Sequence, residues 1–189
     1  MLCIGRIIYP VTSLGRGKRL VIWLKGCNLK CEGCMSKDLW EFDEEDYMPI
    51  FDIFNIVYDY RQKIDGITIS GGEPFLQIDP LLQLLEKIYN YITKDIIIFT
   101  GYYKTELEKN FICQFNMLKK YVSVIIAGRY IENRNNSEGL AGSSNQEYLL
   151  FDNKYKIEEL EKYKREINIF NFKNSVVLVG ILNSKGDDR

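Results

Sequence analysis

The chain has 189 residues, of which 46% are hydrophobic and 13% aromatic, so it can bury the core of one compact domain. Its 25 basic and 26 acidic residues leave a formal net charge of −1, which gives no field that would attract nucleic acid or a membrane surface. The sequence contains no apolar run of the ~18 residues that a spanning helix needs, and no uninterrupted apolar stretch of a signal peptide. We therefore expect a cytoplasmic protein with neither membrane nor nucleic-acid partners.

Histidine is absent from the sequence. This excludes a Ser-His-Asp or Cys-His nucleophile, a histidine-ligated catalytic zinc and an imidazole proton shuttle. Any catalysis is therefore expected to depend on a cofactor or on carboxylates.

Short β-branched apolar runs predict the strands. Each run is continuous rather than alternating, which is typical of strands covered on both faces in a parallel sheet. The runs are RLVIWL (19–24), GITIS (66–70), DIIIFT (95–100) and VSVIIA (122–127).

Segments with helical spacing lie between these strands. Leu81, Leu85 and Ile88 repeat along IDPLLQLLEKIYNYI, and Asp79-Pro80 is expected to supply the N-cap and the first helical residue. PIFDIFNIVYDY (49–60) and a segment with capping-box spacing at Thr105–Glu108 predict two more helices. Alternation of strands and helices predicts an α/β fold with right-handed crossovers.

The pattern changes after Gly128. A polar loop over 129–147 is long enough to be either functional or disordered. In the C-terminal extension, about 150–189, KIEELEKYKRE predicts an exposed helix with Glu158–Lys162 and Glu161–Arg165 pairs. INIF and SVVLVGI then predict a small closing hairpin with KNS in its turn.

Glycine-containing loops follow all of the predicted parallel strands: KGCNLKCEGC, GGEP, GY and GRY. In parallel α/β folds the carboxyl ends of the strands carry the ligand site, and glycine lets backbone approach a ligand closely. A complete eight-fold barrel takes roughly 250 residues. We therefore predict a partial, open (β/α) barrel with mostly parallel strands and one functional rim.

Cys27, Cys31 and Cys34 form a C-x3-C-x2-C motif on the loop after the first predicted parallel strand. A structural zinc would need a fourth ligand from a distant cysteine or a carboxylate. An electron-carrying 4Fe-4S cluster also uses four cysteines. Three cysteines leave one iron open to a substrate or cofactor, which favours a reactive cluster while leaving the zinc and electron-transfer readings as alternatives.

The C-x3-C-x2-C loop, followed by Gly-Gly-Glu-Pro after the next strand, resembles the radical S-adenosylmethionine superfamily. The resemblance implies a 4Fe-4S cluster on the three cysteines, with its fourth iron chelated by the amino and carboxylate groups of S-adenosylmethionine. Reductive cleavage of the sulfonium would then yield methionine and a 5′-deoxyadenosyl radical that abstracts hydrogen. The protein supplies binding, orientation and exclusion of water.

Further segments narrow the resemblance: WLKGCNLKCEGCMSKDLW, GITISGGEPFLQ, FTGY, IIAGRYIE and GLAGSSNQ. In this order they resemble the small activating enzymes of anaerobic ribonucleoside-triphosphate reductase. This implies one radical S-adenosylmethionine core domain over 1–189, with its cluster loop at 25–36. It also implies two partners: a large reductase subunit that receives a glycyl radical, and a one-electron donor such as flavodoxin or ferredoxin.

The resemblance also assigns roles residue by residue. Glu73 would accept a hydrogen bond from the cofactor's ammonium group, and Thr100 to Tyr102 would line the nucleoside side, although a strand-ending turn explains them nearly as well. The residues assigned to S-adenosylmethionine are Gly33, Met35, Gly71, Gly72, Glu73, Thr100, Gly101 and Tyr102.

Other positions are ambiguous or depart from the family. Ala141 stands where we expect an arginine in the reductase activators, so a radical enzyme acting on a peptide or small metabolite is an alternative. Ser143 to Gln146 are expected either to bind cofactor or partner or to hold their own loop. Cys3 and Cys113 are expected to be buried apolar residues, and Trp23 and Trp40 to pack beside the cluster loop.

Overall fold

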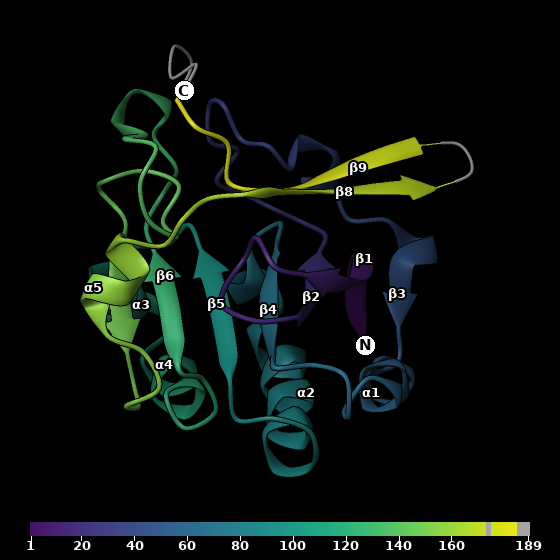
Figure 1. The fold of residues 1–189 in the computed structure, drawn as a ribbon. Coiled ribbons are helices and arrows are strands. Elements are labelled where there is room, and N and C mark those ends of the chain that lie inside the picture. Colours follow the sequence, from purple (N-terminus) through teal and green to yellow (C-terminus); the bar gives the residue numbers. More distant parts are fainter. Residues whose placement is uncertain (173–174, 185–189) are drawn as a thin grey trace.

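The computed structural model describes residues 1–172 and 175–184, and its main feature is an open seven-stranded sheet (Figure 1). The strand order is β3-β1-β2-β4-β5-β6-β7. The central strands β2, β4, β5 and β6 are parallel, whereas β1, β3 and β7 add antiparallel strands at the two sides. The strands are β1 (Leu2–Val11), β2 (Arg19–Leu24), β3 (Tyr47–Met48), β4 (Gly66–Gly71), β5 (Ile96–Thr100), β6 (Val124–Ala127) and β7 (Glu147–Leu150).

The predicted parallel strands and the open α/β fold are confirmed. The three antiparallel strands β1, β3 and β7 were not predicted. β1 contains Gly5 and Pro10, and its pairing with β2 has two register shifts, so it lacks the regular pattern of a strand. β3 is only two residues long, and β7 is mostly half-buried, so neither gives a clear apolar signal.

Helices cover one face of the sheet. Alternate residues of the central strands point to this face, for example Ile22 of β2 and Ile69 of β4, and pack with Leu85 of α2 in the largest apolar core. The helices on this side are α1 (Ile50–Asp59), α2 (Ile78–Tyr91), α3 (Lys104–Asn110) and α4 (Ile112–Leu118).

Two predicted helix starts are wrong by a few residues. The N-cap of α2 is Gln77 rather than Asp79, because a 3-10 helix (Pro74–Gln77) runs directly into it and places Asp79 in the first turn. The N-cap of α3 is Tyr103 rather than Thr105, and Glu106 accepts the hydrogen bond of the Tyr103 backbone N–H at 2.8 Å. In both cases the preceding loop fixes where the helix begins.

The opposite face is covered by the C-terminal extension: α5 (Ile157–Glu161) and the hairpin of β8 (Ile167–Phe172) and β9 (Ser175–Gly180). In Figure 1 the hairpin crosses the sheet near the end where the cluster loop lies. Val179 packs with Trp23 and Leu39, and Leu160 packs with Ile126. The predicted hairpin is confirmed, except that two residues of its expected KNS turn, Lys173 and Asn174, lie outside the described residues.

A buried polar cluster joins the starts of the central strands on this face. Arg19 is fully buried, and its guanidinium donates to Thr68 Oγ1 at 2.7 Å and to Asp95 Oδ1 at 3.1 Å. It also donates to the Tyr155 hydroxyl at 3.1 Å, which in turn donates to Asp95. This cluster ties the segment before α5 to the end of the sheet opposite the cysteines. In the part of the chain that the structure describes, no helix is long and apolar enough to cross a membrane.

Candidate functional site: the three-cysteine loop and its cavity

The cysteine loop leaves β2 and is held against the 3-10 helix at Lys37–Leu39. The backbone N–H of Gly26 donates to Leu39 O at 2.9 Å, and that of Cys27 donates to Trp40 O at 2.8 Å. Cys34 N–H donates to Cys31 O at 3.2 Å, which closes a turn between the last two cysteines. The loop therefore has its own backbone scaffold.

Gly71 and Gly72 press the loop after β4 against the start of the cysteine loop. Gly72 N–H donates to Leu24 O, and Glu73 N–H donates to Gly26 O, both at 2.7 Å. A Cβ on Gly72 would lie 2.2 Å from Gly26 O, and Gly71 has a φ of +110°. Only glycine fits both requirements. Close contact between the two loops is thus one structural reason for the glycine pair.

Glu73 is almost completely buried at the centre of this arrangement. Its Oε1 accepts hydrogen bonds from Phe75 N–H at 2.9 Å and the Thr100 hydroxyl at 2.8 Å, and its Oε2 accepts one from Gly101 N–H at 2.8 Å. Burial nevertheless raises the pKa of Glu73 to about 7, because desolvation outweighs the three donors. A carboxylate offers about four acceptor positions, so Oε2 can still accept from a ligand.

The three cysteines and Glu73 line one cavity of about 130 Å³ at the carboxyl ends of the parallel strands. The structure therefore brings together most of the residues predicted for the site. Its lining includes Cys27, Cys31, Cys34, Gly71, Gly72, Glu73, Thr100 and Gly101. Residues that were not singled out as cofactor contacts also contribute to the wall: Leu29, Ser70, Phe99, Gly128 and Tyr130.

Gly33 and Met35 line a neighbouring cavity of about 540 Å³ rather than the small one. The two cavities share four wall residues, Cys34, Phe99, Tyr130 and Gln146, so they adjoin one another. Gly180 to Ser184, which follow β9, form part of the larger cavity. The end of the hairpin therefore reaches the mouth of the site, which the sequence did not indicate.

Tyr102, unlike the other predicted cofactor residues, lines neither of these two cavities. Its ring packs edge-on against Phe75, and its hydroxyl accepts a hydrogen bond from Asn28 Nδ2 at 3.1 Å. Tyr102 thus supports the cysteine loop from the side of the helices and does not line either cavity.

The GSSNQ segment holds its own loop and the end of β6. Ser143 Oγ is buried and accepts from Ile131 N–H at 3.1 Å, while Asn145 Nδ2 donates to Arg129 O at 2.8 Å. Gln146 accepts from Gly142 N–H at 2.7 Å, donates to Gly128 O at 2.7 Å and also lines both cavities. The loop-holding expectation is confirmed for these three side chains.

Arg129, which follows β6, places a positive charge near the cysteines. Its guanidinium makes a two-pronged ion pair with Glu106, with N–O distances of 2.6 and 2.8 Å. The arginine lowers the pKa of Glu106 through these hydrogen bonds. Burial raises the pKa of the Cys31 thiol, and Arg129 partly opposes that effect. A positive charge is thus fixed close to the loop where thiolates are needed.

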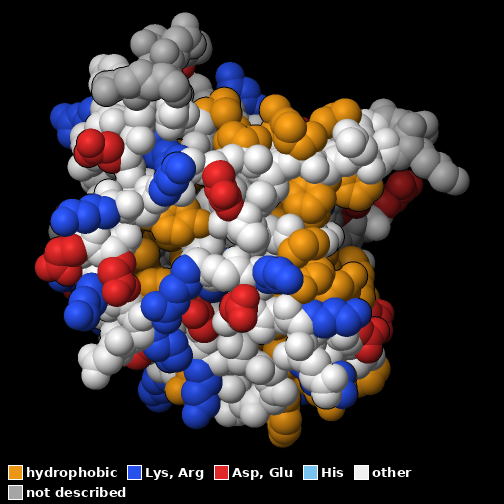
Figure 2. Space-filling model, viewed as in Figure 1, with side chains coloured by type: hydrophobic (Ala, Val, Ile, Leu, Met, Phe, Trp, Pro, Cys, Tyr) orange, Lys and Arg blue, Asp and Glu red, His pale blue; other side chains and the backbone are white. Residues whose placement is uncertain are grey.

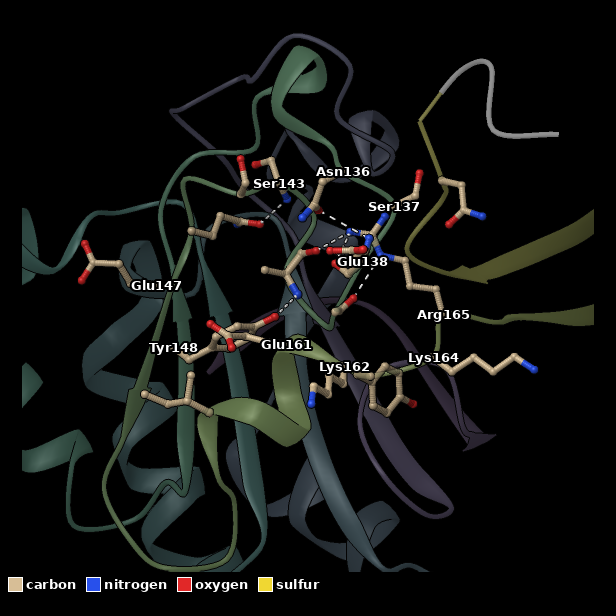
Figure 3. A pocket seen from close by; sticks show the side chains of 17 residues that line it. Asn136, Ser137, Glu138, Ser143, Glu147, Tyr148, Glu161, Lys162, Lys164 and Arg165 are labelled. Atoms are coloured by element: carbon tan, nitrogen blue, oxygen red, sulfur yellow. Dashed lines mark hydrogen bonds between the residues drawn. The ribbon is translucent and has the colours of Figure 1, made fainter. Parts of the chain in front are cut away.

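A groove of about 1160 Å³ lies beside α5, shares Gln146 with the two cavities described above, and has no cysteine in its lining (Figure 3). Arg165 spans this groove, and its expected ion pair with Glu161 is absent from the described residues. The guanidinium instead donates to five oxygen atoms. One belongs to a side chain, Asn135 Oδ1 at 2.7 Å. The other four are backbone carbonyls: Gly139 O at 3.0 Å, Leu182 O at 3.0 Å, Glu138 O at 2.8 Å and Ala141 O at 2.7 Å. Arg165 therefore fastens the 135–141 loop to the chain that follows the hairpin.

The remaining cysteine and tryptophan predictions have mixed outcomes. Cys3 is buried, as predicted, but Cys113 is exposed, because it lies on the outer side of the short helix α4. Neither lines the cavity of the three cysteines. Trp23 packs in the core under the hairpin, whereas Trp40 is half-buried in the cavity wall.

The side chains fit an iron–sulfur cluster better than a single metal ion. Among the residues that the structure describes, no three cysteine or carboxylate side chains converge closely enough to hold one ion. A cluster takes one cysteine per iron, so its ligands surround a group and need not meet at a point. In addition, the buried Trp40 Nε1 has no hydrogen-bond partner among the described residues, which leaves a donor in the cavity wall. Buried donors normally have partners, so this wall fits a guest that accepts hydrogen bonds.

Comparison with known proteins agrees with this reading. The family described as "4Fe-4S single cluster domain" matches residues 13–149, which include all three cavity cysteines. The chain therefore belongs to this class of single-cluster iron–sulfur proteins.

Similar curated proteins narrow the family. The chain is 33% identical over 147 residues to the "Anaerobic ribonucleoside-triphosphate reductase-activating protein" of Haemophilus influenzae, covering 73% of this chain and 92% of that protein. It is 32% identical over 149 residues to the protein of the same description from Enterobacteria phage T4, covering 74% and 88%. A shorter match, 34% over 73 residues, covers 36% of this chain and 29% of a "Pyruvate formate-lyase-activating enzyme" of Listeria monocytogenes. The chain belongs to the radical S-adenosylmethionine activating-enzyme family that these relatives represent.

Proposed function

We propose that this protein installs a glycyl radical on an anaerobic ribonucleotide reductase, using S-adenosylmethionine and a 4Fe-4S cluster. The observation that carries the proposal is the single cavity lined by Cys27, Cys31, Cys34 and Glu73, in a chain similar over most of its length to reductase-activating proteins. We place this activity in one domain spanning 1–189, in the cytoplasm.

Each part of the cavity has a task in this proposal. Cys27, Cys31 and Cys34 would hold the cluster, and their number leaves one iron for S-adenosylmethionine. When bound and reduced by an external one-electron donor such as flavodoxin or ferredoxin, the cluster and S-adenosylmethionine would together supply a carbon-centred radical that can abstract hydrogen, with methionine as the other product. Gly33 and Met35 lie in the adjoining cavity, where they would contact the cofactor by backbone.

Glu73 would orient the amino end of S-adenosylmethionine. The hydrogen bonds from Thr100 and Gly101 fix its carboxylate, and Oε2 keeps acceptor capacity for the cofactor. Phe99, Tyr130 and the apolar part of Trp40 form walls that exclude water from a reactive radical. Gly71 and Gly72 keep this carboxylate beside the cysteine loop, because a side chain at Gly72 would collide with Gly26 O.

The recipient of the radical is proposed to be a large reductase subunit rather than a small metabolite. The similarity to reductase-activating proteins of two organisms supports this choice. The shorter similarity to a pyruvate formate-lyase-activating enzyme favours a second candidate, another glycyl-radical enzyme as recipient. Ala141 does not decide between them: it is buried in an apolar cluster, its backbone N–H donates to the Tyr148 hydroxyl, and its carbonyl accepts from Arg165.

The test uses protein reconstituted with iron and sulfide without oxygen, then reduced. We expect the electron paramagnetic resonance spectrum of the cluster to shift on adding S-adenosylmethionine, and 5′-deoxyadenosine to form. With the anaerobic reductase of the same organism, a glycyl radical signal should appear, and with a formate lyase it should not. Zinc in place of iron, or a spectrum indifferent to S-adenosylmethionine, would contradict the chemistry. A reductase that acquires no glycyl radical signal would contradict only the proposed identity of the radical's recipient.

A further inference from the structure

The β8–β9 hairpin has one face packed on the protein. Phe170, Val177 and Val179 point to the core beneath it, together with Trp23. The Asn168 side chain, on the same face, accepts from Thr12 N–H at 2.8 Å and donates to Thr12 Oγ1 at 2.9 Å. The hairpin is therefore anchored to the loop after β1, as a two-stranded sheet must be to persist in water.

The other face of the hairpin is apolar and exposed. Side chains alternate along a strand, and the register pairs Ile169 with Leu178 and Asn171 with Val176. We call Ile167, Ile169, Val176 and Leu178 the outer hairpin face; the exposed fractions of the last three are 63%, 62% and 53%. In Figure 2, hydrophobic side chains gather along this upper part of the molecule. A strand pair covered on one side normally carries polar residues on the other, so this face is suited to contact another surface.

The hairpin runs directly into the catalytic side of the protein. Gly180 ends β9, and the residues that follow it, Ile181 and Leu182, line the 540 Å³ cavity together with Cys34 and Met35. Leu182 and Met35 are also exposed, at 45% and 48%. A partner protein bound to the outer hairpin face would therefore also lie close to the mouth of the 540 Å³ cavity.

The hairpin also lies outside the region that the family model matches. The matched region ends at residue 149, so it contains the cysteines, Glu73 and Gln146 but neither β8 nor β9. The residues for the shared chemistry and the outer hairpin face thus belong to different parts of the sequence.

We propose that the outer hairpin face is a docking surface for the protein that receives the radical, which presents its glycine to the adjoining cavity. The inference rests on the proposed function and extends it. Small molecules bind in concave sites, whereas an extended apolar face is suited to contact with another protein. The four residues of the outer hairpin face are uncharged, so the contact residues of the partner would be apolar.

The test compares two double variants of the cluster-loaded enzyme. Ile169→Ser with Leu178→Ser changes an exposed cross-strand pair. Phe51→Ser with Ile112→Ser is the matched control, because these residues are 67% and 47% exposed on α1 and α4, away from the hairpin. The readouts are the reductase concentration that gives half the maximal glycyl radical, and 5′-deoxyadenosine formed without reductase.

We expect the hairpin variant to need at least tenfold more reductase and the control less than twofold more, with 5′-deoxyadenosine unchanged in both. A hairpin variant that activates at the wild-type concentration would overturn the docking proposal alone. Light scattering could also show that the wild-type enzyme is a dimer and the hairpin variant a monomer. That result would assign the outer hairpin face to a second copy of this chain and would overturn the docking proposal. Wild-type enzyme that forms 5′-deoxyadenosine but no radical on the reductase would overturn the proposed function, and the docking proposal with it.

Discussion

The Thr100 hydroxyl at the end of β5 donates a 2.8 Å hydrogen bond to Glu73 on the loop after β4. This contact joins two neighbouring strand ends above the sheet, and Gly101 N–H donates to the other carboxylate oxygen. Both donors stabilise the ionised form of Glu73, yet burial still raises its pKa to about 7. The carboxylate is therefore fixed in position and changes charge close to neutral pH.

The pKa of Glu73 predicts a pH-dependent stability of the cluster-free protein. As pH rises from the ordinary value of 4.5 toward 7, the unfolded chain loses this proton while the folded protein keeps it. The free energy of unfolding should therefore fall over this range, by about 3 kcal/mol once both forms are ionised. Urea unfolding at pH 5 and pH 7.5 measures the change.

The matched variant is Glu73→Gln, which cannot ionise. Its free energy of unfolding should vary less between the two pH values than that of the wild type. The comparison is clean because the chain has no histidine to titrate in this window. Equal pH dependence in both proteins would refute the raised pKa.

Iron content should separate the three cavity cysteines from the other two. Cys27→Ala, Cys31→Ala or Cys34→Ala should each leave less than about a tenth of the wild-type iron after reconstitution, since a cluster with only two protein ligands is poorly held. The exposed Cys113→Ala is the control and should bind iron like the wild type. Full iron retention in a Cys34→Ala protein would remove that residue from the ligand set.

Trp40 should raise the reduction potential of the cluster. Its buried Nε1 has no partner among the described residues, so a cluster sulfur in the cavity would give it an acceptor. Trp40→Phe removes the donor but keeps the Trp40 carbonyl that accepts from Cys27 N–H. We expect the potential to fall by about 40 mV, which corresponds to about 1 kcal/mol for one electron.

The Trp40 measurement is a redox titration followed by electron paramagnetic resonance, without S-adenosylmethionine. Trp23→Phe is the control, because Trp23 packs beneath the hairpin and does not line the cavity. A potential that stays the same in Trp40→Phe would show that the indole does not contact the cluster.

Arg165 should stabilise the 135–141 loop, which forms part of the wall of the groove beside α5. Its five hydrogen bonds hold the 135–141 loop to Leu182, and methionine at this position can donate none of them. We expect Arg165→Met to lose about 2–3 kcal/mol of unfolding free energy and to be cut by protease within 135–141. Lys164→Met, the adjacent control, should lose less than about 0.5 kcal/mol, as a surface change does. Protease resistance equal to wild type would argue against this role.

The sequence was most informative where local chemistry decides the structure. Arg19–Leu24 and the other parallel strands could be predicted because strands buried on both faces need continuous apolar residues. Cys27, Cys31 and Cys34 could be assigned to one site because their spacing places three thiols on a single loop. The Glu73 loop could be added because parallel strands end at a common edge.

Contacts between distant segments decided the rest. The use of Gly72 against Gly26, the position of Tyr102 behind the cysteine loop and the five acceptors of Arg165 depend on loops that meet only in the folded chain. Helical spacing predicted Glu161 as the partner of Arg165, but the guanidinium instead binds oxygens of the 135–141 loop and of Leu182. The sequence by itself thus determined the reactive groups and their strand-end location, whereas the tertiary structure decided how they are held and which apolar face stays open. That division follows because local patterns record burial and spacing, while partners far apart in the chain leave no periodic signal.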